Sequence, residues 1–182
     1  NDEGKYQRQK VQYKNGKLYE KNGNEYTGGN KYATKVLEDL NQLANDNDVL
    51  KSRIHDLETS KNKHTIQMPH FKQFNQTKAD AKKCIKGIPT GSTVTYDPTN
   101  RKTKTGNERS PRASLAHELL GHSWDADQGK TDYNLVGKNK LPMFEINAVR
   151  IENLVRLKTG DPKRTTSGEN TEIPTEILDK PF

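Results

Sequence analysis

Apolar residues follow a helical period through the first third of the chain. Between residues 31 and about 60 they recur every three or four positions, at Ala33, Val36, Leu37, Leu40, Leu43, Val49, Leu50, Ile54 and Leu57. This spacing predicts amphipathic helices with one buried face. The polar run at residues 45–48 interrupts the period, so we expect two helices, with Asp48 capping the second.

Alternation of polar and apolar residues predicts strands before these helices. Residues 11–19 form two alternating stretches around Asn15-Gly16, a pair that tolerates the positive φ of a tight hairpin turn. Lys-Asn-Gly recurs at residues 21–23, which extends the hairpin into a predicted small β meander ending at Gly28-Gly29.

Three short segments are predicted in the middle of the chain. Residues 65–68 indicate a strand, residues 78–85 a helix, and residues 92–96 a strand that stops at Asp97-Pro98. The strand at 92–96 lies either at the edge of its sheet, where an extended peptide substrate can pair with it, or in the core. A polar loop is expected from residue 99 to residue 108.

Two helices are predicted in the last third of the chain. Ser110-Pro111 is a strong start signal, because serine caps a helix and proline at the first helical position loses no hydrogen bond. After a predicted loop at residues 125–140, Leu141-Pro142 opens a helix that Gly160 ends. The tail beyond residue 160 shows no period and is expected to be extended.

The first of these helices carries His117-Glu118-Leu119-Leu120-Gly121-His122. Two imidazoles on neighbouring turns can bind zinc, and a glutamate beside the first can take a proton from water at the metal. The histidines are one residue further apart than in the His-Glu-x-x-His motif of zinc peptidases, and five residues correspond to about 140° around a regular helix. A π-bulge brings such residues together, and Gly121 makes distortion inexpensive there, so we predict a bulge within residues 119–121.

A catalytic zinc ion needs a third protein ligand. Glu145 is well placed in the first turn of the last helix, where the small side chain of Ala148 lets that helix approach the zinc helix. Glu152, two turns on and on the same face, can accept a hydrogen bond from a ligand imidazole. The alternative third ligands lie in the loop after His122 and are Asp125, Asp127 and Asp132.

Peptide hydrolysis also needs a donor for the negative charge that develops on the carbonyl oxygen. The candidate donors are Tyr133, Arg150, Arg156 and Arg164. The residue types and their spacing do not choose among them.

Composition narrows the class of protein. The 182 residues are 29% hydrophobic and 30% charged, with no apolar run near the roughly 20 residues that a membrane helix needs. Cys84 is the single cysteine, which excludes an intrachain disulfide and a multi-cysteine zinc site. The net charge of +7 is scattered, which is typical of a solvated surface; a role in meeting an acidic partner or nucleic acid is the alternative. Because the chain opens Asn-Asp-Glu-Gly rather than with Met, we expect a part of a longer protein.

Two resemblances extend this interpretation. His-Glu-Leu-Leu-Gly-His and Glu145-Ile146-Asn147-Ala148 resemble the zinc motifs of dipeptidyl peptidase III, a much larger enzyme. A second resemblance, to the gluzincin-like NleD-like bacterial effector zinc metalloproteases, covers more of the chain. It rests on residues 91–98, on Leu115-Ala116-His117-Glu118-Leu119, and on the series from Glu145 through Glu152 and Arg156 to Arg164. That resemblance implies His117, His122 and Glu145 as zinc ligands and Glu118 as the base, although the extra residue between the histidines departs from it.

The N-terminal Lys-Asn-Gly hairpins resemble the end of Rhs/YD-repeat polymorphic toxins, just before the variable toxin domain. This resemblance implies a bacterial C-terminal toxin that is released from a secreted carrier, acts in a target cell and is neutralised by a cognate immunity protein.

Together these features predict an α+β, zincin-like fold, with a small β-sheet packed on an active-site helix and on a second ligand-bearing helix. We expect a hairpin or linker region at residues 1–30, a zinc metallopeptidase domain at 31–168 and an extended tail at 169–182. The expected activity is zinc-dependent hydrolysis of peptide bonds in a protein. The alternatives are a non-catalytic basic interaction domain with structural zinc or none, and a nucleic-acid-directed toxin, for which no stacking or groove-reading motif is present.

Overall fold

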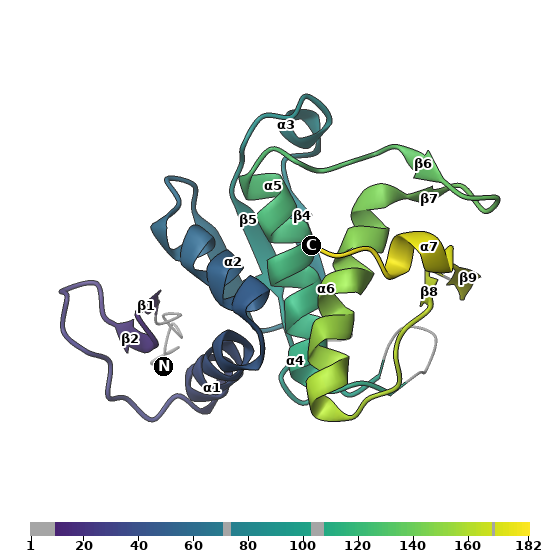
Figure 1. Cartoon of the computed structure of the whole chain (residues 1–182). Coiled ribbons are helices and arrows are strands. Elements are labelled where there is room, and N and C mark those ends of the chain that lie inside the picture. The colour runs from purple at the N-terminus through teal and green to yellow at the C-terminus, as the bar shows by residue number, and fades with distance from the viewer. Residues whose placement is uncertain (1–9, 71–73, 103–107, 169) are drawn as a thin grey trace.

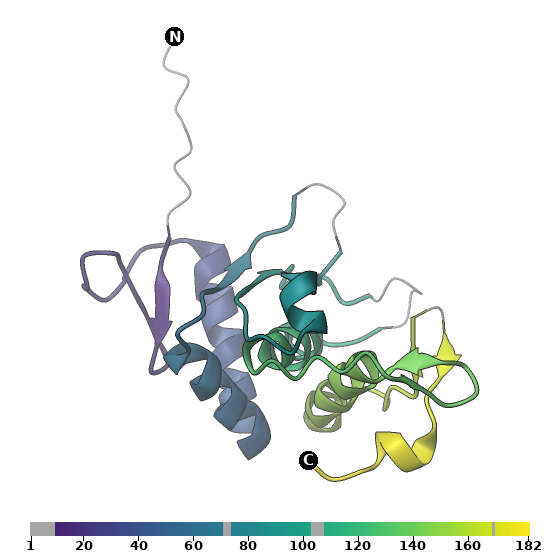
Figure 2. The same ribbon diagram turned by 90° about the horizontal axis from the view of Figure 1, so that it is seen from above.

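The computed structural model describes residues 10–70, 74–102, 108–168 and 170–182. A long helix forms its axis, because α4 (Pro111–Leu115), the π-helical η1 (Ala116–Ser123) and α5 (Trp124–Asp127) follow one another directly. Helix α6 (Met143–Thr159) lies alongside and makes its main contact with η1 (Figure 1). Viewed along their axes, the two helices lie side by side at the centre of the molecule (Figure 2).

A three-stranded sheet contacts the axial helix. Its order is β3 (His64–Gln67), β5 (Ser92–Thr95), β4 (Gln76–Ala79), with β5 parallel to β3 and antiparallel to β4. The predicted strand at 92–96 is therefore central, and the alternative that placed it at the edge is wrong. Val94 of β5 is fully buried, and β4, the edge strand, contacts η1.

Strand β4 was not predicted, because Gln-Thr-Lys-Ala has no apolar alternation to reveal it. The helix expected from residue 78 begins only at α3 (Ala81–Ile85). Asp80 caps α3, since its side chain accepts hydrogen bonds from the backbone of Lys82 and Lys83.

The two helices predicted within residues 31–60 are present, and both contact the axial helix. They are α1 (Lys31–Asp46) and α2 (Asp48–Thr59). Asn30 caps α1, and Asn47, rather than the predicted Asp48, caps α2 by accepting a hydrogen bond from the backbone of Val49. Their apolar faces join the main core, whose buried members are Val36, Leu40, Leu43, Leu50, Ile54, Val94, Tyr96, Ala113, Leu115, Ala116, Leu119, Leu120, Ile151 and Val155.

The predicted N-terminal hairpin is present. Strands β1 (Gln12–Lys14) and β2 (Lys17–Tyr19) are antiparallel, and Asn15 and Gly16 take φ angles of 47° and 76° at the turn. These positive angles are what Asn-Gly permits in a tight turn. The expected third strand of the meander is only a single bridge between Tyr19 and Glu25.

The C-terminal third differs from the sequence-based expectation. The axial helix continues through Asp127, and the segment expected to be a loop pairs β6 (Leu135–Val136) with β7 (Leu141–Pro142). Strands β8 (Thr166–Ser167) and β9 (Thr171–Glu172) form a further hairpin.

The tail is not extended as expected. It contains α7 (Thr175–Leu178), which packs on α6, and buries Ile173 and Leu178 in a second apolar cluster with residues of α6. A four-residue helix is too short for a detectable period, which is why the sequence pattern missed it. The boundaries at residues 30 and 168 remain predictions.

A buried polar cluster fastens the sheet to the end of the axial helix. Asp127 accepts hydrogen bonds from Asn62 and Ser60 and lies 3.0 Å from His64 Nε2, while His64 Nδ1 lies 2.9 Å from Ser92 Oγ. These contacts join α5, β3 and β5. The fold is thus α+β, with a small sheet packed on the helix of His117 and His122, which in turn packs on the helix of Glu145. Within the described residues, every helix is too short or too polar to cross a membrane.

Candidate metal centre

Residues that shortly precede His117 in the sequence fix the start of the axial helix. Ser110 caps it by accepting a hydrogen bond from the backbone of Ala113, and Pro111 occupies the first helical position. The backbone N–H of Ser110 donates to Asp161, just after α6, at 2.7 Å. The start of the axial helix and the end of α6 are therefore held together.

The π-helix turns His117 and His122 toward each other. Hydrogen bonds in a π-helix span five residues rather than four, so residues five apart share a face. The two imidazole centroids lie 4.9 Å apart, with the ring planes at 84°. The predicted bulge is confirmed, and it is longer than expected because the π-helical segment runs from Ala116 to Ser123.

Gly121 is needed for a reason that the sequence did not reveal. It does not have a positive φ, so the conformational freedom of glycine is not what the helix uses. Instead, a Cβ at this position would stand 2.8 Å from both Cα and Cβ of Ala148 on α6, closer than real Cβ atoms approach. Gly121 and Ala148 together let η1 and α6 touch, which brings Glu145 to the histidines.

Side chains from distant segments bind the main chain of the π-helix. Arg53 of α2 donates from Nη1 to the carbonyl of Leu120 at 2.6 Å, with its guanidinium 3.8 Å from the Trp124 ring centroid. Thr77 of β4 contacts the carbonyl of Glu118 at 2.8 Å. Sequence reasoning missed both residues, since neither carries a local motif and they lie 67 and 41 positions from their partners.

Glu145 completes a group of three ligand atoms. Its carboxylate oxygens lie 4.0 Å from His117 Nε2 and 3.7 Å from His122 Nε2, and the three ligand atoms are all within 4.8 Å of one another. Glu145 is in the first turn of α6, as predicted. The carboxylate is 33% exposed, so this side of the group is open to solvent.

The three aspartates considered as alternative third ligands lie elsewhere. Asp127 belongs to the cluster with His64, and Asp132 accepts a hydrogen bond from the backbone of Asn134. Asp125 is buried, and its nearest opposite charges are Arg53 and Lys130. Among the described residues, only Glu145 joins the two histidines in a group that could hold a metal ion.

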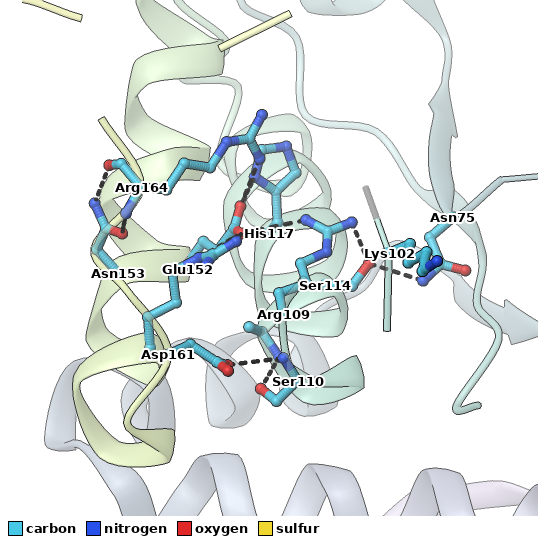
Figure 3. Close-up of polar contacts among 12 residues, drawn as sticks. Asn75, Lys102, Arg109, Ser110, Ser114, His117, Glu152, Asn153, Asp161 and Arg164 are labelled. Atoms are coloured by element: carbon cyan, nitrogen blue, oxygen red, sulfur yellow. Dashed lines mark hydrogen bonds and ion pairs between the residues drawn. The ribbon is translucent and has the colours of Figure 1, made fainter. Parts of the chain in front are cut away.

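Glu152 supports the imidazole of His117 from behind. Its Oε2 lies 3.0 Å from His117 Nδ1, at ion-pair distance but without the alignment of a good hydrogen bond. The carboxylate is fully buried and is shared by three guanidinium groups, from Arg109, Arg156 and Arg164. Figure 3 shows Arg109, Arg164 and His117 around it. Arg109, which precedes the helix cap, was not foreseen because an arginine in a polar loop gives no sequence signal.

The surrounding charges keep Glu152 ionised. Burial by itself raises the pKa of its carboxyl, but contact with His117 and the charges of Arg109 and Arg164 outweigh burial and hold the pKa well below its usual range. A buried carboxylate this close to Nδ1 favours a ring orientation that leaves Nε2 facing Glu145.

The second imidazole is held in the form that binds metal. Burial lowers the pKa of His122, and the neighbouring His117 and Arg164 lower it further, while Glu118 and Glu145 act in the opposite direction. A lowered pKa favours the neutral ring, whose nitrogen lone pair is free for a cation.

Glu118 lies next to this group and is also buried. Its Oε2 accepts a hydrogen bond from the Thr77 hydroxyl at 2.9 Å, and the same hydroxyl is 2.8 Å from the Glu118 carbonyl. The Thr77 hydroxyl therefore lies between the carbonyl and the carboxylate of Glu118, and its single proton is donated to one of these two acceptors at a time.

The four candidate donors for the carbonyl oxygen of a substrate differ in their positions and partners. Arg150 binds the carbonyls of Lys180 and Pro181, and Arg156 binds Glu152 and the carbonyl of Pro162, so both are occupied away from the ligand group. Tyr133 is 42% exposed and packs edge-to-face on Phe144, which in turn packs on His122. Arg164 lies beside His117, because both bind the same oxygen of Glu152.

The ligand group suits zinc. Two imidazole nitrogens and one carboxylate oxygen are ligands that zinc uses at catalytic sites, with bonds near 2.0–2.2 Å and a fourth, open position. Tetrahedral bonds of that length place ligand atoms about 3.3 Å apart. The three candidate ligand atoms lie within 4.8 Å of one another, so a bound zinc ion would draw them together, and the partly exposed Glu145 has room to move.

The fold and the site therefore define a zincin-like α+β protein with a His-His-Glu group on two contacting helices. Comparison with known families agrees with this class. The model of the peptidase family M91, described as effector protein, matches residues 20–173, and the chain belongs to that family. Membership identifies a metallopeptidase-type effector, which confirms the resemblance seen in the sequence at the level of an effector peptidase family. Neither a curated protein nor a solved structure shows significant similarity to the chain.

Proposed function

We propose that the chain is a zinc-dependent endopeptidase that cleaves a protein inside a target cell. The observation that carries this proposal is the π-helix η1, which turns two histidines five residues apart toward Glu145. A π-helix is rare and less favourable than an α-helix, and such segments concentrate at functional sites. In this protein the π-helical geometry brings together the three residues of the candidate metal site.

His117, His122 and Glu145 would hold the zinc ion. Three protein ligands leave one position for water, whereas structural zinc sites are closed by four. This favours a catalytic site over the alternative of an interaction domain with structural zinc. When bound, zinc acidifies water and polarises the carbonyl group of a substrate.

Glu118 would serve as the proton carrier. Its carboxylate is adjacent in sequence to the first ligand and is fixed by Thr77. It accepts the proton of the attacking water as the carbon–oxygen bond forms, and then delivers it to the nitrogen of the leaving amine as the peptide bond breaks. Water is consumed, and one carboxyl and one amino terminus are produced.

Delivery is the second part of the proposal. The M91 match identifies an effector family, which supports action in a cell other than the one that makes the protein. The N-terminal hairpin with its Lys-Asn-Gly repeats supports a toxin domain released from an Rhs/YD-repeat carrier. A producing cell that makes such an enzyme needs protection, so we include a cognate immunity protein among the proposed partners.

Two measurements on purified protein test the enzyme. Elemental analysis at neutral pH should find one zinc per chain, and His122→Ala should lose it. Expression of the wild type in susceptible cells should generate new protein termini that proteomics detects, and Glu118→Gln, which keeps the ligand group, should abolish them.

The outcomes separate the alternatives. A chain that binds no zinc contradicts the metal proposal. A zinc-loaded chain whose Glu118→Gln variant cleaves as well as the wild type contradicts the assigned mechanism. Binding of DNA or RNA that weakens steeply with salt, without any cleavage of protein, would instead favour the nucleic-acid-directed toxin.

A further inference from the structure

We propose that Arg164 binds the carbonyl oxygen of the scissile peptide bond as negative charge develops on it, which makes Arg164 a catalytic residue. The assignment rests on the proposed peptidase function and names a group that the family match does not.

The main chain at Arg164 is fastened to α6. Its N–H donates to Asn153 Oδ1, and its carbonyl accepts from Asn153 Nδ2, both at 2.8 Å. One asparagine side chain thus pairs with both polar groups of the residue. Such two-point pairing holds the loop segment at a fixed distance from the helix that carries Glu145 and Glu152.

The side chain is held as firmly as the main chain. Arg164 Nε donates to the carbonyl of Thr166 at 2.8 Å, and Nη1 donates to Glu152 Oε2 at 2.7 Å. Glu152 Oε2 is also 3.0 Å from His117 Nδ1, so the guanidinium stands directly beside the ligand imidazole (Figure 3). Two of its three nitrogens are therefore used to place the group.

The third nitrogen, Nη2, has no hydrogen-bond partner among the residues that the structure describes. The side chain retains 18% exposure, in contrast to the nearly buried side chain of Arg156, which binds the same carboxylate. Arg164 thus holds a guanidinium with a spare donor beside His117, one of the three candidate ligands. A donor fixed before the reaction stabilises developing charge without reorganising, which is the property of an oxyanion-binding group.

The local charge balance also favours an anion at this point. Three guanidinium groups share the single carboxylate of Glu152, so positive charge is in excess on this side of His117. The carbonyl oxygen acquires negative charge only during the reaction. An excess of fixed positive charge therefore stabilises the transition state more than the neutral substrate.

Tyr133 is the remaining candidate donor, and the structure favours Arg164 over it. Tyr133 packs edge-to-face on Phe144, and Phe144 in turn packs edge-to-face on His122. Its hydroxyl has no hydrogen-bond partner among the described residues that would fix its position, whereas Arg164 is held at four points.

The experiment compares binding of a charged transition-state mimic with binding of zinc. The probe is N-phosphoryl-leucyl-tryptophan, whose tetrahedral phosphoryl group carries the charge that the reaction develops. Its affinity for the zinc-loaded chain is measured for the wild type, Arg164→Met, Arg164→Lys and the matched control Arg156→Met, which removes a guanidinium from the same carboxylate. Zinc affinity is measured by competition with a chromophoric chelator.

We expect Arg164→Met to weaken probe binding at least tenfold and to lower turnover about 100-fold, in the range for loss of one oxyanion donor. Zinc affinity should stay within threefold of the wild type. Arg164→Lys keeps a charge for Glu152 but lacks the second nitrogen, so it should fold normally and still lose probe affinity. Arg156→Met should lower stability without a comparable loss of probe affinity.

Three results would overturn the proposal. They are unchanged probe binding in both Arg164 variants, a fall in zinc affinity that parallels the loss of probe binding, and absence of probe binding by the zinc-loaded wild type. Failure of the proposed peptidase function shows differently, as a wild type that binds zinc and probe but cleaves no protein. In that case the difference in probe affinity between the wild type and the Arg164 variants still shows whether Arg164 binds an anion at this site.

Discussion

Gly121 of the π-helix packs directly on Ala148 of α6, and the absence of a side chain at Gly121 is what permits this contact. The contact lies one residue before His122 and one turn after Glu145, so it sets the spacing between the two elements that carry the candidate ligands. Because the two helices already touch at this point, a larger side chain at Gly121 has little room.

We expect Gly121→Ala to push α6 away from η1. The added methyl group would stand 2.8 Å from Ala148, and overpacking of this kind costs about 1–3 kcal/mol. Zinc affinity should fall at least tenfold, because Glu145 moves with α6. Urea unfolding and chelator competition measure the two effects. Adding Ala148→Gly should restore part of both, and a Gly121→Ala variant with wild-type zinc affinity would show that the contact does not set the ligand spacing.

Thr77→Val should impair catalysis while leaving the metal site intact. Valine has nearly the same shape but cannot donate a hydrogen bond to the carboxylate of Glu118. Loss of one such bond is worth about 1–1.5 kcal/mol, which corresponds to roughly tenfold in turnover. Steady-state kinetics and zinc analysis test this, with Thr77→Ser as the control that keeps the hydroxyl. A valine variant as active as the serine variant would contradict the positioning role.

Glu152 and Glu145 offer a matched pair of substitutions on one helix. Glu152→Gln leaves the guanidinium groups of Arg109, Arg156 and Arg164 without their buried counter-charge, which should cost about 3–5 kcal/mol of folding free energy. Glu145→Gln removes a partly exposed carboxylate, so the stability change should stay within about 0.5 kcal/mol while zinc affinity is lost. Chemical unfolding of the metal-free chain measures stability, and zinc titration measures metal affinity. Equal changes in stability for the two variants would refute the assignment of a structural role to Glu152 and a ligand role to Glu145.

Asp125 should give the metal-free chain a pH-dependent stability. Burial raises the pKa of its carboxyl to about 7, although Arg53 and Lys130 act in the opposite direction. Because the folded pKa exceeds the unfolded value, the contribution is fully present below about pH 4 and is lost as the pH rises through about 7. The total is on the order of 4 kcal/mol.

Replacing Asp125 with asparagine should flatten this dependence. Urea unfolding of the metal-free chain at pH 5 and pH 8 measures it, and Asp132→Asn provides a control with the same change in net charge. If both variants keep the wild-type difference between the two pH values, Asp125 is not its source.

Local signals in the sequence predicted the ends of the helices and the core of the site. Ser110-Pro111 starts its helix and Gly160 ends its helix through local backbone geometry, so the sequence around each residue is enough to predict the helix end. The π-helix was predictable for a similar reason, since five-residue spacing of two ligands is incompatible with a regular helix. Glu145 required a further step, the expectation that two helices pack closely.

Features that depend on long-range packing were not predictable. Strand β4 has a polar sequence and is defined by its pairing with β5. Arg53 and Thr77 act on η1 across large sequence separations. Gly121 was singled out correctly but explained by backbone freedom, whereas its actual role is contact with a helix that follows more than 20 residues later.

The shared carboxylate of Glu152 makes assembly of the site an all-or-none event. Its partners come from the segment before the axial helix, from that helix, from α6 and from the loop after α6. A fragment lacking any one of these segments would leave buried charge without a partner. The imidazole of His117 can therefore be supported from behind only in a chain in which all four segments have folded together.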